Sequence, residues 1–149
     1  MGTDRHEIDV RDSTSLERVC PPLQMGSVAR CWNFSPDGKA LAVGSDDGSA
    51  YVWSMETGEV LHPRFRHTSW VQSVHFSPDG SRLLTSGDDG TAKVWSLLQE
   101  SESAAMTLPA NLGATRFWDT IPRGRTPGPI AITLKDGALR LVDPERLVE

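Results

Sequence analysis

The sequence predicts an all-β fold made of repeated four-stranded antiparallel units. A stretch of 21 residues occurs twice, at Phe34–Ser54 and Phe76–Ser96, with 13 identical positions and no gap. Each copy carries two turn signals, Ser-Pro-Asp-Gly and Asp-Asp-Gly, between short apolar runs. The offset of 42 residues lies in the range of stacked or radial repeat architectures. The repeat therefore organises the whole chain.

The strands of the first copy follow from its turns. We expect strands at Val28–Phe34 and Ala40–Gly44, joined by a turn in which Pro presets φ and Gly accepts a positive φ. Asp-Gly at the next turn is a strong hairpin signal and leads into a third strand that ends at Trp53. Glu59–Phe65 is expected to be an edge strand, because it contains a Pro, which cannot donate to a ladder.

The second copy repeats this order 42 residues later. We expect strands at Trp70–Phe76, Arg82–Ser86 and Ala92–Trp95, and an edge strand at Ala105–Leu108. Apolar groups on both faces of the third strands suit a sheet packed between two neighbours.

The N-terminal region is divided in two. Residues 1–16 are polar and without a period, so we expect a disordered tail. Residues 17–23 align with Glu59–Phe65 at the same offset, with Pro21 on Pro63, and predict a lone edge strand.

A third, degenerate copy ends the chain. Its first strand is expected at Ala114–Trp118 and its second and third strands around Ile132–Leu134 and Leu139–Val142. The segment from 120 to 129 is rich in Pro and Gly and replaces the short turn, so an irregular, exposed loop is expected there.

These residues resemble the WD40-repeat β-propellers, in the form found in prokaryotic chains. The resemblance implies four-stranded blades. We expect three in an incomplete ring: blade 1 at about 28–65, blade 2 at about 70–108, and blade 3 at about 113–143, completed by strand 17–23 of the same or another chain.

The resemblance also implies a structural hydrogen-bond set in each blade, joining a His, a Ser or Thr, an Asp and a Trp. Matched position by position, the second copy has all four members: His67, Thr85, Asp89 and Trp95. The first copy keeps Asp47 and Trp53, with Met25 and Val43 in the other places, and the third keeps Asp136. We therefore expect the middle blade to be the most rigid, and Asp89→Ala to be more damaging than Asp136→Ala.

Composition limits the classes of function. The net charge of −5 argues against nucleic-acid binding, and no apolar run approaches the ~20 residues that cross a bilayer. The first 15 residues have no apolar segment of a secretory signal. Cys20 and Cys31 are too few for a disulfide scaffold, so reduced thiols in a cytoplasmic protein are expected.

No residue pattern indicates an enzyme, a metal site or a cofactor. The Asp pairs at 46–47 and 88–89 are explained by hairpin turns, and no spacing of Cys and His fits zinc. Candidate partner contacts are Trp70, Arg123 and Arg125, although the favoured explanations are a core position for Trp70 and a solvated loop for the arginines.

Three blades cannot close a ring of about 4–8 blades, and each end of the row would expose a sheet face. We therefore expect a non-catalytic scaffold for protein partners, which needs another copy or a partner to close. The alternatives are a fragment of a larger WD40 protein without independent function, and a ligand-binding or enzymatic propeller subunit.

Overall fold

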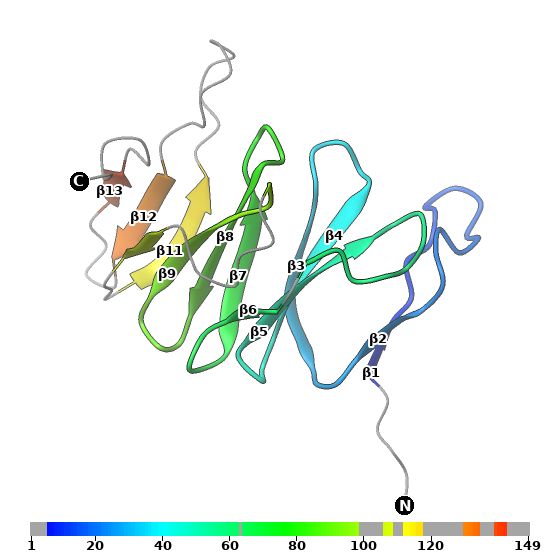
Figure 1. The fold of residues 1–149 in the computed structure, drawn as a ribbon, viewed down its shortest axis with the longest axis horizontal. Coiled ribbons are helices and arrows are strands. Elements are labelled where there is room, and N and C mark those ends of the chain that lie inside the picture. The colour runs from blue at the N-terminus through cyan, green and yellow to red at the C-terminus, as the bar shows by residue number, and fades with distance from the viewer. Residues whose placement is uncertain are drawn as a thin grey trace, which may run out of the picture.

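The computed structural model describes residues 6–62 and 64–98 and, beyond them, the strands at 106–108, 112–117, 130–134 and 139–142. The described elements are all strands, which stack as three antiparallel sheets with a small hairpin at one end (Figure 1). The all-β prediction is confirmed. Asp136, Arg123, Arg125 and the 120–129 loop lie outside the described residues.

The first sheet has the order β3-β4-β5-β6. Its strands are β3 (Ala29–Phe34), β4 (Ala40–Ser45), β5 (Ser49–Ser54) and β6 (Phe65–Arg66). The two turns place Gly38 and Gly48 at φ of 71° and 80°, the left-handed region that favours glycine. The expected edge strand is interrupted: Val60 forms a single bridge to Trp53, and regular pairing resumes only at β6.

The second sheet repeats this order 42 residues later. It contains β7 (Val71–Phe76), β8 (Arg82–Gly87), β9 (Ala92–Ser96) and β10 (Met106–Leu108), and β10 pairs with β9 at its outer edge. The pairing of β8 with β9 places Leu84 opposite Val94, as Ala42 lies opposite Val52 in the first sheet. The sequence repeat is therefore also a repeat of strand register.

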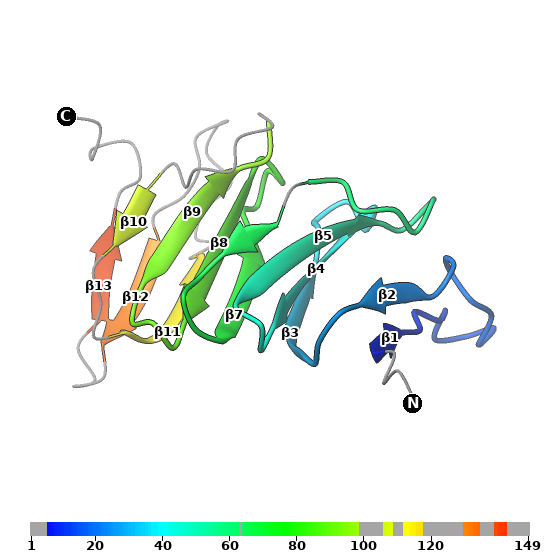
Figure 2. The same ribbon diagram turned by 60° about the horizontal axis from the view of Figure 1, so that its bottom comes forward.

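The third sheet consists of β11 (Leu112–Phe117), β12 (Ile130–Leu134) and β13 (Leu139–Val142), in that order. It lies beyond the second sheet, with β11 next to β7 and β8, and β7 lies against β3 and β4 in the same way (Figure 2). In both joints, therefore, the first strand of one sheet packs on the first two strands of the preceding sheet.

The main core lies between the first and second sheets. Ala42, Ala50 and Val52 of the first sheet pack against a set of buried side chains from the second sheet, together with Phe65. The members from the second sheet are Val71, Val74, Phe76, Leu83 and Trp95. Asn33 Oδ1 also accepts a hydrogen bond from the Phe76 N–H at 3.1 Å across the same joint.

The N-terminal segment differs from the expected disordered tail. β1 (His6–Ile8) pairs antiparallel with β2 (Leu23–Met25), and the intervening chain turns back at Asp12, whose carboxylate accepts the N–H groups of Thr14 and Ser15. Ile8 and Val10 pack against the buried cluster on the outer face of the first sheet. The expectation of disorder is therefore wrong for residues 6–16, because the pairing of β1 with β2 and two apolar side chains, Ile8 and Val10, dock a segment that shows no period.

The lone edge strand is also displaced. The prediction put it at 17–23, but the regular strand is β2, at Leu23–Met25. Consecutive prolines at 21 and 22 supply no N–H groups, which delays the ladder until Leu23. Leu23 nevertheless stands at the repeat position of Phe65 in β6, 42 residues on. Within this chain β2 does not complete the third sheet, because it pairs with β1 at the opposite end of the row.

Candidate functional site

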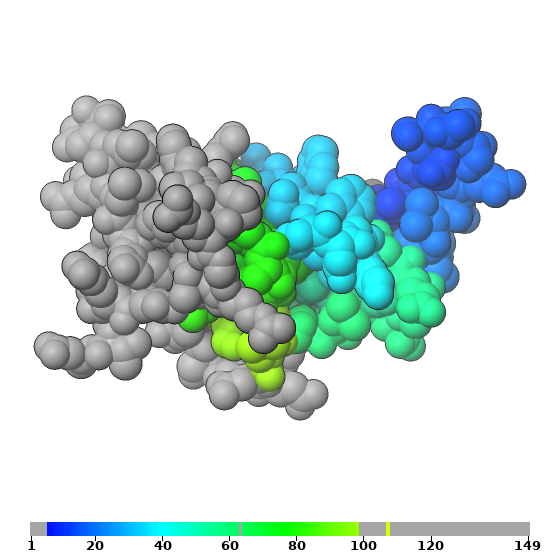
Figure 3. All heavy atoms as spheres, turned by 90° about the horizontal axis from the view of Figure 1, so that it is seen from above, coloured from blue at the N-terminus to red at the C-terminus, as the bar shows by residue number. Residues whose placement is uncertain are grey.

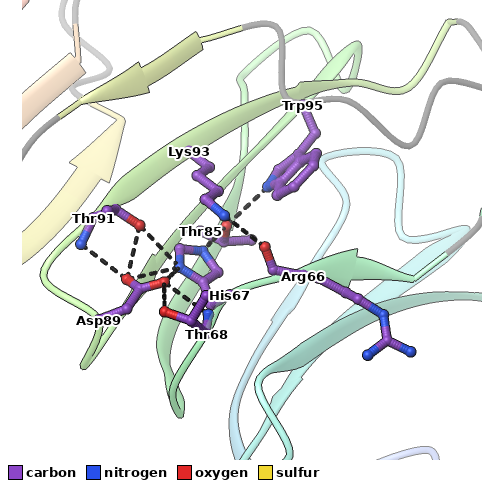
Figure 4. Close-up of polar contacts among 8 residues, drawn as sticks. All are labelled: Arg66, His67, Thr68, Thr85, Asp89, Thr91, Lys93 and Trp95. Atoms are coloured by element: carbon purple, nitrogen blue, oxygen red, sulfur yellow. Dashed lines mark hydrogen bonds and ion pairs between the residues drawn. The ribbon is translucent and has the colours of Figure 1, made fainter.

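The four side chains of the second repeat form one continuous hydrogen-bonded chain (Figure 4). The Trp95 indole N–H donates to Thr85 Oγ1 at 2.8 Å, and Thr85 Oγ1 lies 2.7 Å from His67 Nε2. On the other side of the ring, His67 Nδ1 lies 3.0 Å and 3.1 Å from the two carboxylate oxygens of Asp89. The chain links the segment before β7 to β8, β9 and the turn between them.

The geometry fixes the direction of each hydrogen bond. A carboxylate only accepts, so His67 Nδ1 carries a proton, and in the neutral ring Nε2 is then an acceptor. Thr85 therefore donates to Nε2 and receives the indole N–H with its own lone pair. A neutral His67 satisfies every member of the set, and this is the state that burial favours.

The pKa shifts of His67 and Asp89 agree with a neutral imidazole at His67. Burial lowers the pKa of His67 below its usual value of 6.5, and the nearby Asp89 offsets this only in part. For Asp89, burial alone would raise the pKa. The hydrogen bonds from the Thr68 and Thr91 N–H groups, the Thr91 hydroxyl and His67 outweigh burial and hold the pKa well below 3.8. The pair is thus a neutral imidazole beside a carboxylate.

Two members of the network were not anticipated. The Thr68 N–H donates to Asp89 Oδ2 at 2.9 Å, and Thr91 donates to Oδ1 through its N–H at 2.9 Å and its hydroxyl at 2.7 Å. Lys93 Nζ lies 5.7 Å from the centre of the Trp95 ring and donates to the Arg66 carbonyl. The position of Thr91, two residues after Asp89 in a tight turn, was the sequence signal that could have revealed it.

A hydroxyl, an imidazole and a carboxylate in this order resemble the arrangement of a nucleophilic triad. The side chains of Thr85 and His67 are almost entirely buried, and the Thr85 oxygen is already occupied by the Trp95 N–H. A substrate carbonyl has no approach to that oxygen. The set therefore acts as a structural clamp on the turn at Asp89.

The first repeat replaces this clamp by apolar packing. Met25 and Val43 stand in the places of His67 and Thr85, and both are buried with Trp53 in one cluster. Trp53 stacks on Tyr51 with ring centres 5.1 Å apart. Asp47 accepts the Ser49 N–H at 2.8 Å and the Tyr51 hydroxyl at 3.3 Å, so it supports only its own hairpin.

Trp70, the one aromatic residue named as a candidate partner contact, is less exposed than Trp32 and Phe34. Trp70 is 44% exposed, and the Arg30 guanidinium covers its ring at 4.2 Å. Trp32 on β3 is 67% exposed and Phe34 is 48% exposed, although the second-sheet residues at their repeat positions, Val74 and Phe76, are 1% and 8% exposed. The sequence repeat puts Trp32 and Val74 at equivalent strand positions, and only the place of Trp32 in the first sheet of the row makes it a surface residue.

A groove runs beside these two aromatic residues. It has a volume of about 470 Å³ and lies between the N-terminal segment and β3, with Ile8 and Val10 on one side and Trp32, Phe34 and Leu41 on the other. A second groove of about 530 Å³ lies between the first two sheets, beside both Ser-Pro-Asp-Gly turns. Asp37 and Asp79 at that groove are used by their own turns, since each accepts a Ser hydroxyl and a backbone N–H.

A family model for the WD domain, G-beta repeat, matches residues 24–54 and 58–96. These two segments are WD40 repeats. The two matched segments cover β2 to β5 and β6 to β9, and therefore include the complete clamp of the second repeat. Curated proteins give no significant match to the chain.

Among the described residues, no group of three or more His, Cys, Asp and Glu side chains is arranged to hold a metal ion. The described part of the chain also contains no helix with the length and apolar character needed to cross a membrane. Cys20 and Cys31 are both unbonded, and burial raises the pKa of the Cys31 thiol to about 11.

Proposed function

We propose that this chain is a non-catalytic WD40 scaffold that binds protein partners and that its row of blades needs another copy or a partner to close. WD40 repeats generally serve as scaffolds for protein interactions, and the rigid clamp at Asp89 suits that role. The observation that carries the proposal is the bare outer face of β3, where Trp32 and Phe34 stand at positions that the second sheet buries. An exposed aromatic patch bordered by polar groups is typical of an interaction surface.

The two alternative functions, an enzymatic propeller and a fragment without independent function, require different features of the molecule. An enzymatic propeller needs polar groups from several blades that converge on an accessible site, whereas the polar groups of the clamp are buried and paired with one another. A fragment without independent function would retain no partner. Cytoplasmic location belongs to this proposal, and the unbonded cysteines at 20 and 31 agree with it.

The test is affinity capture with the tagged full chain and with the double variant Trp32→Asp/Phe34→Asp. The wild-type chain should retain one or more proteins that the double variant loses. Val60→Asp/Leu98→Asp is the matched control, because both residues are exposed and lie away from β3. Equal capture by all three chains, or no capture by any of them, contradicts a partner-binding role for this face.

A further inference from the structure

β1 and β2 together copy the outer two strands of a sheet of this repeat. Leu23 in β2 stands 42 residues before Phe65 in β6. β1 pairs with β2 so that Ile8 lies opposite Leu23, and β5 pairs with β6 so that Ala50 lies opposite Phe65. Both pairs are antiparallel, so β1 holds the place that β5 has in the first sheet. Figure 3 shows this segment, in blue, at one end of the molecule.

The second edge of β1 borders the groove of about 470 Å³. In the first sheet β5 lies between β6 and β4, whereas β1 pairs only with β2 among the strands that the structure describes. The groove is lined by five consecutive residues, 7–11, and by no residue of β2. Successive side chains of a strand point to opposite faces, so a lining of consecutive residues marks the edge of this segment rather than one face. The groove therefore lies where a further strand would pair with β1.

The far wall of the groove is the surface that such a strand would cover. It includes Trp32 and Phe34, which stand at the repeat positions of Val74 and Phe76. In the joint between the first two sheets, Val74 and Phe76 are buried in one cluster with Ala42, which β4 contributes. A strand at the free edge of β1 would hold the place of β4. It would therefore bury the two aromatic side chains that are now exposed.

The repeat also specifies the side chains of this strand. In β4, Gly44 lies opposite Ala50 of β5, and Ala42 is the next residue on the same face. Both positions face the second sheet, and a Cβ on Gly44 would lie only 2.6 Å from Val71 Cγ1. Larger side chains would overpack such a joint. Because Ile8 holds the place of Ala50, a strand in the groove needs Ala or Gly opposite Ile8 and two residues further along.

We infer that this groove binds an extended segment of a partner protein, which pairs antiparallel with the free edge of β1 and presents Ala or Gly at alternate positions to Trp32 and Phe34. This inference rests on the proposed function and names the kind of partner. A strand added to a free edge gains main-chain hydrogen bonds, and its alternate side chains provide specificity. Ile8 and Val10 already pack on the outer part of this face, so the occupant is one strand and not a whole sheet.

The probe is a synthetic peptide with the sequence of residues 38–46, which contains β4, the strand that fills the equivalent place in the first sheet. Nuclear magnetic resonance of the isotope-labelled full-length chain follows its binding. The peptide should shift the signal of the Trp32 indole N–H and the amide signals of residues 7–11 in a saturable way. The absence of a saturable shift at millimolar peptide overturns the inference.

Two changed peptides of equal charge test which face of the strand meets the first sheet. The peptide with Ala42→Lys and Gly44→Lys should bind at least about tenfold more weakly, because both ammonium groups would be buried against aromatic rings. The peptide with Leu41→Lys and Val43→Lys should retain binding, because its changes lie on the opposite face. Equal binding by the two peptides, or the reverse order, contradicts the proposed register.

Two N-methylated peptides test the pairing of the strand with β1. Alternate residues of an antiparallel strand direct their N–H groups to the same neighbour. Methyl groups on the backbone nitrogens of Leu41 and Val43, or of Ala42 and Gly44, therefore block opposite edges of the peptide. Only one of the two patterns should abolish binding. Equal effects of the two patterns would indicate apolar contact without strand pairing and would overturn the inference.

Variants of the full-length chain test the site. Trp32→Asp/Phe34→Asp should lose binding of the unchanged peptide and keep its far-ultraviolet spectrum, since both side chains are exposed. Val60→Asp/Leu98→Asp should bind as the wild type does. Retained binding by the Trp32→Asp/Phe34→Asp chain overturns the inference. The proposed function would survive the failure of every peptide test if capture from a lysate still depended on Trp32 and Phe34.

Discussion

His67 lies between two hydrogen-bond partners, one of which needs a donor and the other an acceptor. Asp89 requires a proton on Nδ1, and Thr85 requires a lone pair on Nε2. Only the neutral imidazole supplies both. A second proton, placed on Nε2, would leave the Thr85 hydroxyl proton without its acceptor, so the state of one ring controls the whole clamp.

The stability of the protein should therefore fall as the pH falls from 7 toward 5. Burial lowers the pKa of folded His67 below 6.5, so the unfolded chain binds the proton more readily. The contribution is complete above pH 6.5 and is lost on acidification. Asp89, whose pKa is also lowered, adds a second loss below pH 3.8. Urea unfolding at several pH values measures the slope.

His67→Gln should weaken this dependence between pH 7 and 5, although it also lowers stability at every pH. His6→Asn is the matched control, since it removes an imidazole from β1 that takes no part in the clamp. An unchanged slope in His67→Gln would show that another group controls the dependence.

Asp89→Ala should destabilise more than Asp47→Ala, although the two residues hold equivalent positions in the Asp-Asp-Gly turns of the two repeats. Asp89 accepts hydrogen bonds from His67, Thr68 and Thr91, and its loss leaves buried donors unpaired at about 1–3 kcal/mol. Asp47 supports only its own hairpin and the Tyr51 hydroxyl, so a loss of about 1 kcal/mol or less is expected. Chemical denaturation midpoints that shift equally would contradict the difference.

At the scale of the elements, the joint between the first two sheets depends on the absence of a side chain. A Cβ on Gly44 in β4 would lie 2.6 Å from Cys31 Sγ and 2.6 Å from Val71 Cγ1. These atoms belong to β3 and β7, so one glycine allows two strands of one sheet and the first strand of the next to meet. The second repeat has Ser86 at this position, and its hydroxyl lies 2.7 Å from that of Ser73.

Gly44→Ala should cost about 1–3 kcal/mol, the usual range for overpacking a filled core. Gly26→Ala is the matched control: no atom lies within 4 Å of its added Cβ, so a change near zero is expected. Thermal or urea unfolding of both variants checks this. Gly44→Ala with the stability of Gly26→Ala would show that the joint is looser than the structure indicates.

At the scale of the molecule, the N-terminal segment is part of the folded unit. Leu23 is fully buried and packs with Trp53 on the face where a preceding sheet would lie. The segment therefore covers apolar area that the first sheet would otherwise expose, as a terminal cap does in a repeat array. Its cover stops short of Trp32 and Phe34, which remain exposed.

Leu23→Ala should lower the free energy of unfolding by about 2–5 kcal/mol, the range for truncating a buried leucine. Leu16→Ala, at a residue that is 66% exposed in the same segment, should be close to neutral. Denaturation midpoints of the two variants give the comparison. Neutral effects for both would mean that the segment is not packed on the first sheet.

The sequence by itself determined the repeat and everything local to it. The Ser-Pro-Asp-Gly and Asp-Asp-Gly turns fix strand ends through φ preferences, and a 42-residue match carries each strand to its next position. The resemblance to WD40 repeats, and not the repeat itself, assigned His67, Thr85, Asp89 and Trp95 to one hydrogen-bonded set. The assignment could be made residue by residue because all four lie within one repeat and its immediate entrance.

Only the tertiary structure decided how the row begins. A three-residue strand such as β1 carries too little pattern to be read, and its pairing with β2 depends on apolar contacts with the first sheet. The exposure of Trp32 depends on the same cause: Val74 occupies the same repeat position but has a sheet in front of it. Burial is a property of neighbours along the row, and a residue at the end of the row has different neighbours from its repeat equivalent.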